Sequence, residues 1–331
     1  LLAEIPAGSV PPFRVGPGQA APIMTGAMLP EGADACVMVE DSRLDEGRVH
    51  LERAVSVGEN VRRRGEHLQT GEVVVRAGRP VRPADVAMAA SLGYPALSCI
   101  PRPRVAILST GSELVEPGLP LAPGKIRDSN SYALEALVLS AGAQPLRLGV
   151  VPDRPATLEE AVRRAVSSAD VLITSAGVSV GEHDYVRAAL EKMGGQLALW
   201  RIRMRPGKPL AFGCAGLVPM FGLPGNPVST MVGFEIFVRP ALARMLGRAW
   251  QPRRLEARLG EPLRKKAGFR MFLRCRLSRN GEGWTAATTG SQGSHILRSM
   301  VEADGLMDLS EDVESLAAGD RVTVLALDYS A

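Results

Sequence analysis

Short apolar runs alternate with segments of helical spacing through the middle of the chain, from residue 104 to about residue 247. The apolar runs predict buried strands at residues 105–108, 146–151, 171–174, 197–203 and 217–221. Apolar residues three or four positions apart predict helices at residues 129–141, 157–168, 184–193 and 227–246, and Thr157-Leu-Glu-Glu160 has the form of a capping box. This alternation predicts an α/β domain whose central, mostly parallel sheet is covered by helices on both faces.

The segments on either side of this α/β domain, which we place at residues 104–249, have another pattern. Residues 1–77 contain short β-branched runs, such as 36–39 and 73–75, between glycine and proline turns, so we expect a small β-rich N-terminal domain. Residues 78–103 form a connector with a predicted helix at 82–93, closed by Gly93. A second small β domain is predicted at residues 250–331, from strand-like runs at 255–259, 269–277, 284–288 and 322–327.

Composition narrows the class of protein. The 331 residues are 46% hydrophobic and carry a net charge of +4, with basic residues mixed among acidic ones except at 62–64 and 201–208, so we expect no nucleic-acid partner. The four cysteines lie far apart without a C-x-x-C pair, which indicates a reducing, cytoplasmic location and no zinc site.

Two further features bear on membranes and on the start of the chain. The uncharged stretch at residues 209–234 contains four prolines and five glycines, so we expect no membrane span there. The first ten residues do not have the pattern of a signal peptide. Because the chain begins with Leu1 rather than Met, we expect an upstream segment to be missing.

Polar, glycine-rich loops follow all five predicted strands of the α/β domain. They begin near Ser109, Asp153, Ser175, Pro206 and Pro224. Ligands of open α/β sheets bind in the crevice beyond the carboxyl ends of the strands. We therefore expect the five loops to converge on one edge and to form the active site.

Three carboxylates lie in these loops, on Glu113, Asp153 and Asp184. Mg²⁺ is commonly bound by one or two carboxylates together with phosphate oxygens of the substrate, so this set predicts a magnesium site. Asp153 and Asp184 are equally well explained as helix N-caps. Glu113 is a poor capping residue, and a functional role is the better explanation for it.

Basic residues gather in the loop after the fourth strand. Arg201, Arg203 and Arg205 alternate, so in an extended strand they share one face, which is also typical of a solvated surface. Lys208 stands between Gly207 and Pro209 in a tight loop, from which it can reach a phosphate or another oxyanion.

The remaining loops suit an anionic ligand as well. Asn226 is a good N-cap and Pro227 suits the first helical position, so a helix with free N–H groups is expected to begin there. The glycine loop at 177–181 matches neither a P-loop nor a dinucleotide fingerprint. The residues by themselves thus predict a phosphate and metal site in an α/β domain flanked by β modules.

Two motifs in the flanking domains have a plain structural explanation. Thr25-Gly26 ends an apolar step and is typical of a turn. The segment Gly290-Ser-Gln-Gly-Ser-His295 precedes a helical stretch at residues 296–301 and is typical of a turn that caps it. Both interpretations stay open beside a functional one.

The chain resembles the molybdopterin molybdenumtransferase family, to which the E domain of gephyrin also belongs. The resemblance extends from about residue 4 to the end of the chain and rests on motifs in a fixed order: Ile23-Met-Thr-Gly-Ala27, Ser109-Thr-Gly-Ser-Glu-Leu114, Gly177-Val-Ser-Val-Gly-Glu182 with Asp184-Tyr185, Pro206-Gly-Lys-Pro209, Gly222-Leu-Pro-Gly-Asn-Pro-Val-Ser229 and Gln292-Gly-Ser-His295. The resemblance implies that molybdate is inserted into adenylated molybdopterin with Mg²⁺ present, giving molybdenum cofactor and AMP.

The resemblance also implies an elongated homodimer whose site lies between the α/β domain of one subunit and the N-terminal part of the other, from which Thr25 offers its hydroxyl. Other cofactor-biosynthesis proteins are possible partners. The expected catalytic residues are Glu113, Asp153, Asp184 and Lys208, with Glu113 and Asp184 as metal ligands. The expected substrate-binding residues are Thr25, Ser109, Thr110, Ser175, Gly177, Ser179, Gly181, Arg201, Arg205, Gly207, Pro224, Gly225, Asn226, Pro227 and Ser229.

The chain departs from the family pattern at several positions. The family's Ser-x-x-Met-Asp-Gly-Tyr-Ala motif does not occur in it, His67 stands where Asp is usual, Ala176 where Gly is usual, and Arg201 and Arg205 where lysines are common. Two other functions stay open. A molybdopterin adenylyltransferase shares such an α/β domain but lacks the flanking β modules, and a gephyrin-like scaffold would be a binding module.

Overall fold

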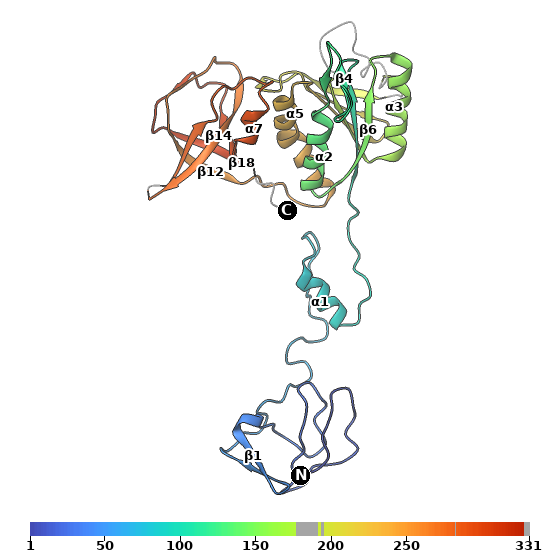
Figure 1. Ribbon diagram of the computed structural model, residues 1–331, viewed down its shortest axis with the longest axis vertical. Coiled ribbons are helices and arrows are strands. Elements are labelled where there is room, and N and C mark those ends of the chain that lie inside the picture. The colour runs from blue at the N-terminus through green and yellow to red at the C-terminus, as the bar shows by residue number, and fades with distance from the viewer. Residues whose placement is uncertain (177–190, 193–194, 282, 328–331) are drawn as a thin grey trace. The chain divides into compact units, whose positions relative to one another are not determined.

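The computed structural model describes residues 1–176, 191–192, 195–281 and 283–327. It divides into two compact units (Figure 1). The first comprises Leu1–Ala77 and Arg82–Met88, and the second comprises Gly78–Val81 and Ala89–Ala331. None of the helices formed by the described residues is both long and apolar enough to span a membrane.

The first unit is built mainly from turns. A short helix, η1 (Val39–Asp41), leads into an antiparallel hairpin of β1 (Ser42–Asp45) and β2 (Arg48–Leu51), and the connector helix α1 spans Pro83–Ser91. The hairpin turns at Glu46 and Gly47, both with positive φ (45° and 78°), as a two-residue type I′ turn requires. The strands predicted at 36–39 and 73–75 do not form. Their valines have no core to enter, since Val39 and Val73 are 79% and 63% exposed.

The α/β domain of the second unit has a six-stranded sheet in the order β6-β3-β7-β11-β10-β8. Its strands are β3 (Arg104–Thr110), β6 (Gln144–Val151), β7 (Val171–Ser175), β8 (Gln196–Trp200), β10 (Ala211–Ala215) and β11 (Val218–Leu223), with a small pair β4 (Leu114–Val115) and β5 (Ile126–Arg127) beside it. The helices are α2 (Asn130–Ser140), α3 (Pro155–Ser168), α5 (Pro227–Gly233), the π-helix η2 (Phe234–Val238) and α6 (Arg239–Met245).

The period of two along β3 explains why helices cover both faces of this sheet. Val105 and Ile107 pack with α2, η2 and α6 in one core, whereas Ala106 and Leu108 pack with α3 in a second core. Residues 105–108 are apolar on both faces of β3, and residues 105–110 are all buried. In Figure 1, α2 and α3 accordingly lie on opposite sides of the strands. The predicted α/β architecture is confirmed.

Several local predictions in this domain were wrong. The single strand expected at 217–221 is the second arm of the hairpin β10–β11, whose antiparallel first arm was not predicted, although the sheet is mostly parallel as expected. Helix α3 begins at Pro155 after Arg154, so Thr157 lies inside the helix and forms no capping box. The strand expected at 197–203 ends at Trp200, because Arg201 has a φ of 70°. The helix expected at 184–193 falls almost wholly outside the described residues.

The C-terminal domain is a closed barrel. Its strands are β12 (Arg254–Leu259), β13 (Leu263–Arg264), β14 (Arg270–Asn280), β15 (Gly283–Thr288), β16 (Gly305–Leu309), β17 (Ser315–Leu316) and β18 (Arg321–Ala326), with the short helix α7 (Arg298–Val301). Strand β15 pairs with both β12 and β14, which closes the sheet around an apolar core. The sheet also takes in β9 (Met204–Arg205) from the α/β domain, paired with the start of β14.

Candidate active site

The strand register places the predicted loops on one edge of the sheet. Ser175, at the end of β7, is level with Ser109 in β3 and with Leu223 in β11, and Thr110 is level with Val151 in β6. These four parallel strands end together. Strand β8 is antiparallel to β10, which is itself antiparallel to β11, so the chain leaves β8 at the same edge. The described parts of all five loops therefore start from one edge.

A buried network supports the first of these loops. Ser109 Oγ donates to Asp128 Oδ1 at 3.3 Å, and the same carboxylate accepts from the Ser131 backbone N–H at 3.1 Å and from Ser131 Oγ at 2.6 Å. Ser109, Asp128 and Ser131 are each at most 1% exposed. Ser109 was predicted to contact substrate, but its hydroxyl faces the interior and anchors the end of β3 to the start of α2.

Asn130 links two of the predicted loops, and sequence reasoning did not identify it. Its Nδ2 donates to Ser175 Oγ at 2.8 Å and to the carbonyl oxygen of Gly225 at 2.7 Å. One amide at the beginning of α2 thus connects the end of β7 to the loop after β11. A polar residue at a helix start directly after the expected loops is the signal that could have found it.

Glu113 and Asp153 come from adjacent loops at this edge. Asp153 Oδ2 accepts from the Ser112 backbone N–H at 3.3 Å, and both carboxylates are exposed. Gly111 has a φ of 150°, and a Cβ on it would lie 2.8 Å from Glu113 Oε1. The absence of a side chain at Gly111 is therefore what lets the Glu113 carboxylate lie against the backbone.

The basic loop after β8 is folded back on itself and contacts the C-terminal barrel. Ile202 N–H donates to the Lys208 carbonyl oxygen at 3.1 Å. The guanidinium of Arg205 and the ammonium of Lys208 lie 4.5 Å and 5.8 Å from the centre of the Phe269 ring. Both predicted cations therefore make cation–π interactions with the Phe269 ring.

Gly207 and Arg201, which neighbour these cations in the chain, were also predicted to bind substrate. Gly207 (φ 105°) packs on Met204, whose Cε would lie 2.7 Å from a Cβ at that position. Arg201 is exposed and has a φ of 70°, and its backbone N–H donates to the Leu210 carbonyl oxygen at 2.9 Å. The close approach at Gly207 explains why the loop needs a glycine there.

Helix α5 begins as expected, with Asn226 as N-cap and Pro227 in the first turn. Asn226 does not cap the helix with its side chain. Its Nδ2 donates instead to Ser294 Oγ at 3.0 Å, and Val228 N–H donates to the Ser294 carbonyl oxygen at 3.1 Å. A loop of the barrel therefore occupies part of the helix start that was predicted to be free.

The barrel loop that carries Ser294 is fastened by a buried arginine. Arg274 is fully buried, and its guanidinium donates to Ser299 Oγ at 3.0 Å and to the Gly293 carbonyl oxygen at 3.1 Å. Burial lowers the pKa of Arg274 to about 10. The Gln292–His295 motif is thus more than a turn before α7, since it connects the barrel to the edge of the sheet.

Ala176 stands where the family pattern has glycine, and its backbone has the conformation that favours glycine. It has a φ of 70°, a conformation that glycine adopts at little cost and alanine does not. Its Cβ would lie 3.4 Å from a Cβ on Gly225, and its N–H donates to the Leu223 carbonyl oxygen at 3.0 Å. Ala176 therefore holds a strained position between two of the loops.

The remaining predicted site residues lie in or just before helix α5, in the first unit and outside the described residues. Pro224 and the half-exposed Pro227 flank Asn226, and Ser229 is buried in α5. Thr25 belongs to the first unit, where it is exposed in a turn closed by a hydrogen bond from Ala27 N–H to the Met24 carbonyl oxygen. Outside the described residues lie Gly177, Ser179, Gly181 and Asp184.

The donor groups at this edge suit a hard cation such as Mg²⁺. Glu113 and Asp153 carry exposed carboxylates, and Thr110 Oγ1 is a buried hydroxyl with no hydrogen-bond partner among the described residues. No three His, Cys, Asp or Glu residues gather in the part of the chain that the structure describes. Because Mg²⁺ commonly takes only one or two carboxylates and completes its shell with water and phosphate oxygens, the two exposed carboxylates fit it.

Three family models match the chain in order. Residues 2–93 match the MoeA N-terminal region (domain I and II), residues 106–244 match a probable molybdopterin binding domain, and residues 256–327 match the MoeA C-terminal region (domain IV). These matches cover both β-rich flanks as well as the α/β domain.

Similar proteins and structures carry related names. A molybdopterin molybdenumtransferase of Haemophilus influenzae is 39% identical over 91% of this chain and 76% of its own length, and molybdopterin molybdenumtransferase 2 of Mycobacterium tuberculosis is 38% identical over 97% and 80%. A relative from Nostoc is 42% identical, and the chain spans 59% of its length. The crystal structure of a molybdopterin biosynthesis MoeA protein from Pyrococcus horikoshii, 32% identical, superposes on the whole chain with a TM-score of 0.82 and 81% of that protein covered.

Proposed function

This chain belongs to the molybdopterin molybdenumtransferase (MoeA) family of molybdenum cofactor biosynthesis, and we propose that it inserts molybdate into adenylated molybdopterin, with release of AMP, at the described edge of the α/β sheet. The observation that carries the proposal is the single edge at which β3, β6, β7 and β11 end and the chain leaves β8, because the carboxylate, hydroxyl and cationic loops all start there. Both substrates are anions, and a cationic loop beside helix α5 suits them.

In this proposal the basic residues of the site bind anions and the acidic residues bind the metal ion. Lys208, with Arg201 and Arg205, holds anionic oxygens of molybdate and of the adenylate phosphate. Glu113, Asp153 and Asp184 stand on the acidic side, and Glu113 and Asp184 would bind Mg²⁺ there. Bound Mg²⁺ neutralises charge on phosphate oxygens. Gly111 makes room for the Glu113 carboxylate and Gly207 for Met204, and the buried hydroxyls of Thr110 and Ser175 lie at the starts of these loops, with that of Ser229 in α5.

The proposal includes a cytoplasmic homodimer in which Thr25 of the partner subunit faces the loop of Asp184. It is supported by the small first unit, which has few large buried side chains and exposes Met24, Met28 and Val39. In light scattering we expect a dimer at micromolar concentration. A mixture of Thr25→Ala and Asp184→Asn subunits should regain part of the activity that each variant lacks, and a monomer with no regain would contradict this arrangement.

Direct measurement of AMP release tests the activity itself. Protein in excess over adenylated molybdopterin is mixed with molybdate and Mg²⁺, and AMP is followed over a single turnover. We expect molybdate-dependent release that Glu113→Gln slows about a hundredfold, with Glu160→Gln on the exposed face of α3 as the charge-matched control. Consumption of ATP with molybdopterin would instead indicate an adenylyltransferase, and binding without AMP release would indicate a scaffold.

A further inference from the structure

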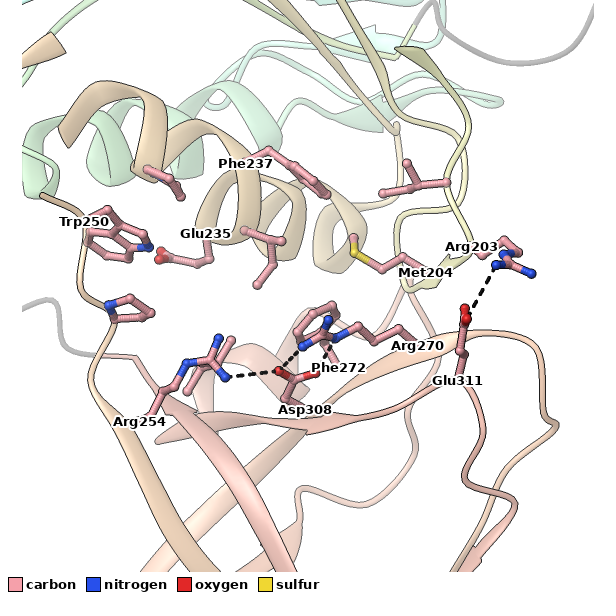
Figure 2. A pocket seen from close by; sticks show the side chains of 15 residues that line it. Arg203, Met204, Glu235, Phe237, Trp250, Arg254, Arg270, Phe272, Asp308 and Glu311 are labelled. Atoms are coloured by element: carbon pink, nitrogen blue, oxygen red, sulfur yellow. Dashed lines mark hydrogen bonds and ion pairs between the residues drawn. The ribbon is translucent and has the colours of Figure 1, made fainter. Parts of the chain in front are cut away.

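A groove of about 580 Å³ lies between the α/β domain and the barrel, and residues 202–204 of the segment that also carries the basic loop line one part of it. One wall is formed by η2 and α6, and the other by β14 and β18 (Figure 2). No residue assigned above to substrate or metal lines it. Its volume is in the range of ordinary small-molecule sites, which extends from about 300 to 1,000 Å³.

The floor of the groove is apolar and firmly packed. Phe272, Met204 and Leu325 are at most 8% exposed and belong to the apolar cluster between the two domains, and Phe237 packs against that cluster. Trp250, at one end, is 38% exposed. Figure 2 shows Phe237, Trp250 and Phe272 around the space between the two walls. A rigid floor with aromatic rings favours a flat apolar body.

The rim of the groove carries an excess of one positive charge. Asp308 accepts from Arg270 through two hydrogen bonds of 2.7 Å each, while Arg254 reaches the same carboxylate only at 3.6 Å. Glu235 is bound by Arg239 at 2.6 Å, and Glu311 by Arg203 at 3.4 Å. Arg203, Arg254 and Arg270 line the groove, and Arg239 pairs with Glu235 from outside the lining, so four guanidinium groups meet three carboxylates.

Among the arginines of the groove, Arg254 has the guanidinium that can still bind a ligand. Its side chain is 54% exposed, and no hydrogen bond from its guanidinium is found among the described residues. The carboxylates, by contrast, are all engaged by arginines, so the groove has nothing to offer a second cation. An anionic group at Arg254 would complete the pairing that Asp308 makes only in part.

We propose that this groove binds a small amphipathic anion, that is, an apolar ring or short chain ending in one carboxylate, sulfonate or phosphate group. The apolar body lies on Phe237 and Phe272 beside Trp250, and the anionic group is bound by Arg254. The site is separate from the molybdate and adenylate site, and the ligand contacts Met204, which packs beneath Gly207 of the basic loop.

Binding of 8-anilinonaphthalene-1-sulfonate, an aromatic anion whose fluorescence rises in apolar sites, tests the proposal on the native protein. We expect one equivalent to bind, with displacement by 4-phenylbutyrate. Neither 4-phenylbutylamine nor inorganic phosphate should displace it, because the first lacks the negative charge and the second the apolar body. Displacement by the amine, or by phosphate alone, would overturn the proposal.

Two variants and one control variant locate the site. Arg254→Glu should weaken binding at least tenfold, whereas Arg258→Glu, an exposed arginine on the same strand that does not line the groove, should leave it unchanged. Ile236→Trp, which fills the groove, should abolish binding while circular dichroism confirms the fold. Equal binding by all four proteins would contradict the proposal. So would a change of subunit number in Ile236→Trp, since the groove would then be an interface between copies of the chain.

Discussion

The backbone N–H of Val228 donates to the carbonyl oxygen of Ser294 at 3.1 Å, so the first turn of α5 rests on a loop of the barrel. The side chain of Ser294 adds a second link, through Asn226 Nδ2. The C-terminal domain is therefore part of the edge at which the sheet loops end. Its arrangement affects the site even where it supplies no ligand.

Removal of the Ser294 hydroxyl should destabilise this connection. Ser294→Ala removes the acceptor of the hydrogen bond from the exposed amide of Asn226, and since an intramolecular hydrogen bond typically contributes about 1 kcal/mol net, we expect the free energy of unfolding to fall by up to that amount. Urea denaturation measures the change. Ser291→Ala, on the exposed part of the same loop, is the matched control and should change stability by less than about 0.5 kcal/mol. An equal loss in both variants would show that the Asn226 contact contributes nothing.

Substitution of Lys208 should mainly affect adenylate binding, and substitution of Asp184 should mainly affect the rate of AMP release. Lys208→Ala removes a cation that meets an anion in the ground state, so it should mainly weaken adenylate binding measured by calorimetry. Asp184→Asn removes a proposed metal ligand and should mainly slow AMP release in a single turnover. Loss of one such charge contact is worth about 2–4 kcal/mol, or roughly thirty- to a thousandfold. Arg321→Ala, on the outside of the barrel, should change neither. Effects below about threefold for both would assign these residues to structure.

Ala176→Gly should stabilise the protein, against the usual direction for this substitution. Because Ala176 has a φ of 70°, glycine relieves about 1–2 kcal/mol of strain and loses about 0.5–1 kcal/mol through its freer unfolded chain. We expect a net gain of up to about 1 kcal/mol in thermal or urea unfolding. At Ala141, where φ is −79°, the same change should destabilise instead. Destabilisation at both positions would mean that the strain at Ala176 is negligible.

Three of the four cysteines differ clearly in burial and should react with thiol reagents in that order. Cys99 and Cys214 are exposed, whereas burial, with some contribution from Asp304, raises the pKa of the Cys275 thiol to about 12. Iodoacetamide at pH 8 should label the first two in native protein and Cys275 only after unfolding. The raised pKa favours the folded state below the unfolded thiol pKa of about 8.5, and this contribution is lost as pH rises from there toward 12. Labelling of native Cys275 within minutes would contradict its burial.

The sequence was a good guide where local periodicity and burial agree. The segment 105–108 is apolar on both faces, and β3 lies between two apolar cores. The alternation of strands and helices then placed the polar loops on one edge by topology alone. Asn226 and Pro227 were correctly predicted to begin a helix. Proline suits the first helical position because its fixed φ is helical and the N–H that it lacks would have no partner there.

The sequence was a poor guide where the deciding contact is distant in the chain. Asn226 donates to Ser294, 68 residues away, and Asn130 to Gly225, 95 residues away. Neither pairing has a local signature. The missed hairpin β10–β11 has a different cause, because its arms are both apolar and only Gly216, with a φ of 62°, marks the turn.

Strand β9 belongs to the α/β domain by sequence and to the barrel by hydrogen bonding. Met204 is also packed with Phe272 and Leu325 in the cluster that fills the space between the two domains. A gene fragment encoding residues 250–331 would leave the first rung of β14 unpaired and this cluster open to water. The two domains therefore cannot be recombined as independent modules. An exchange of barrels between relatives would have to carry residues 202–210 with it.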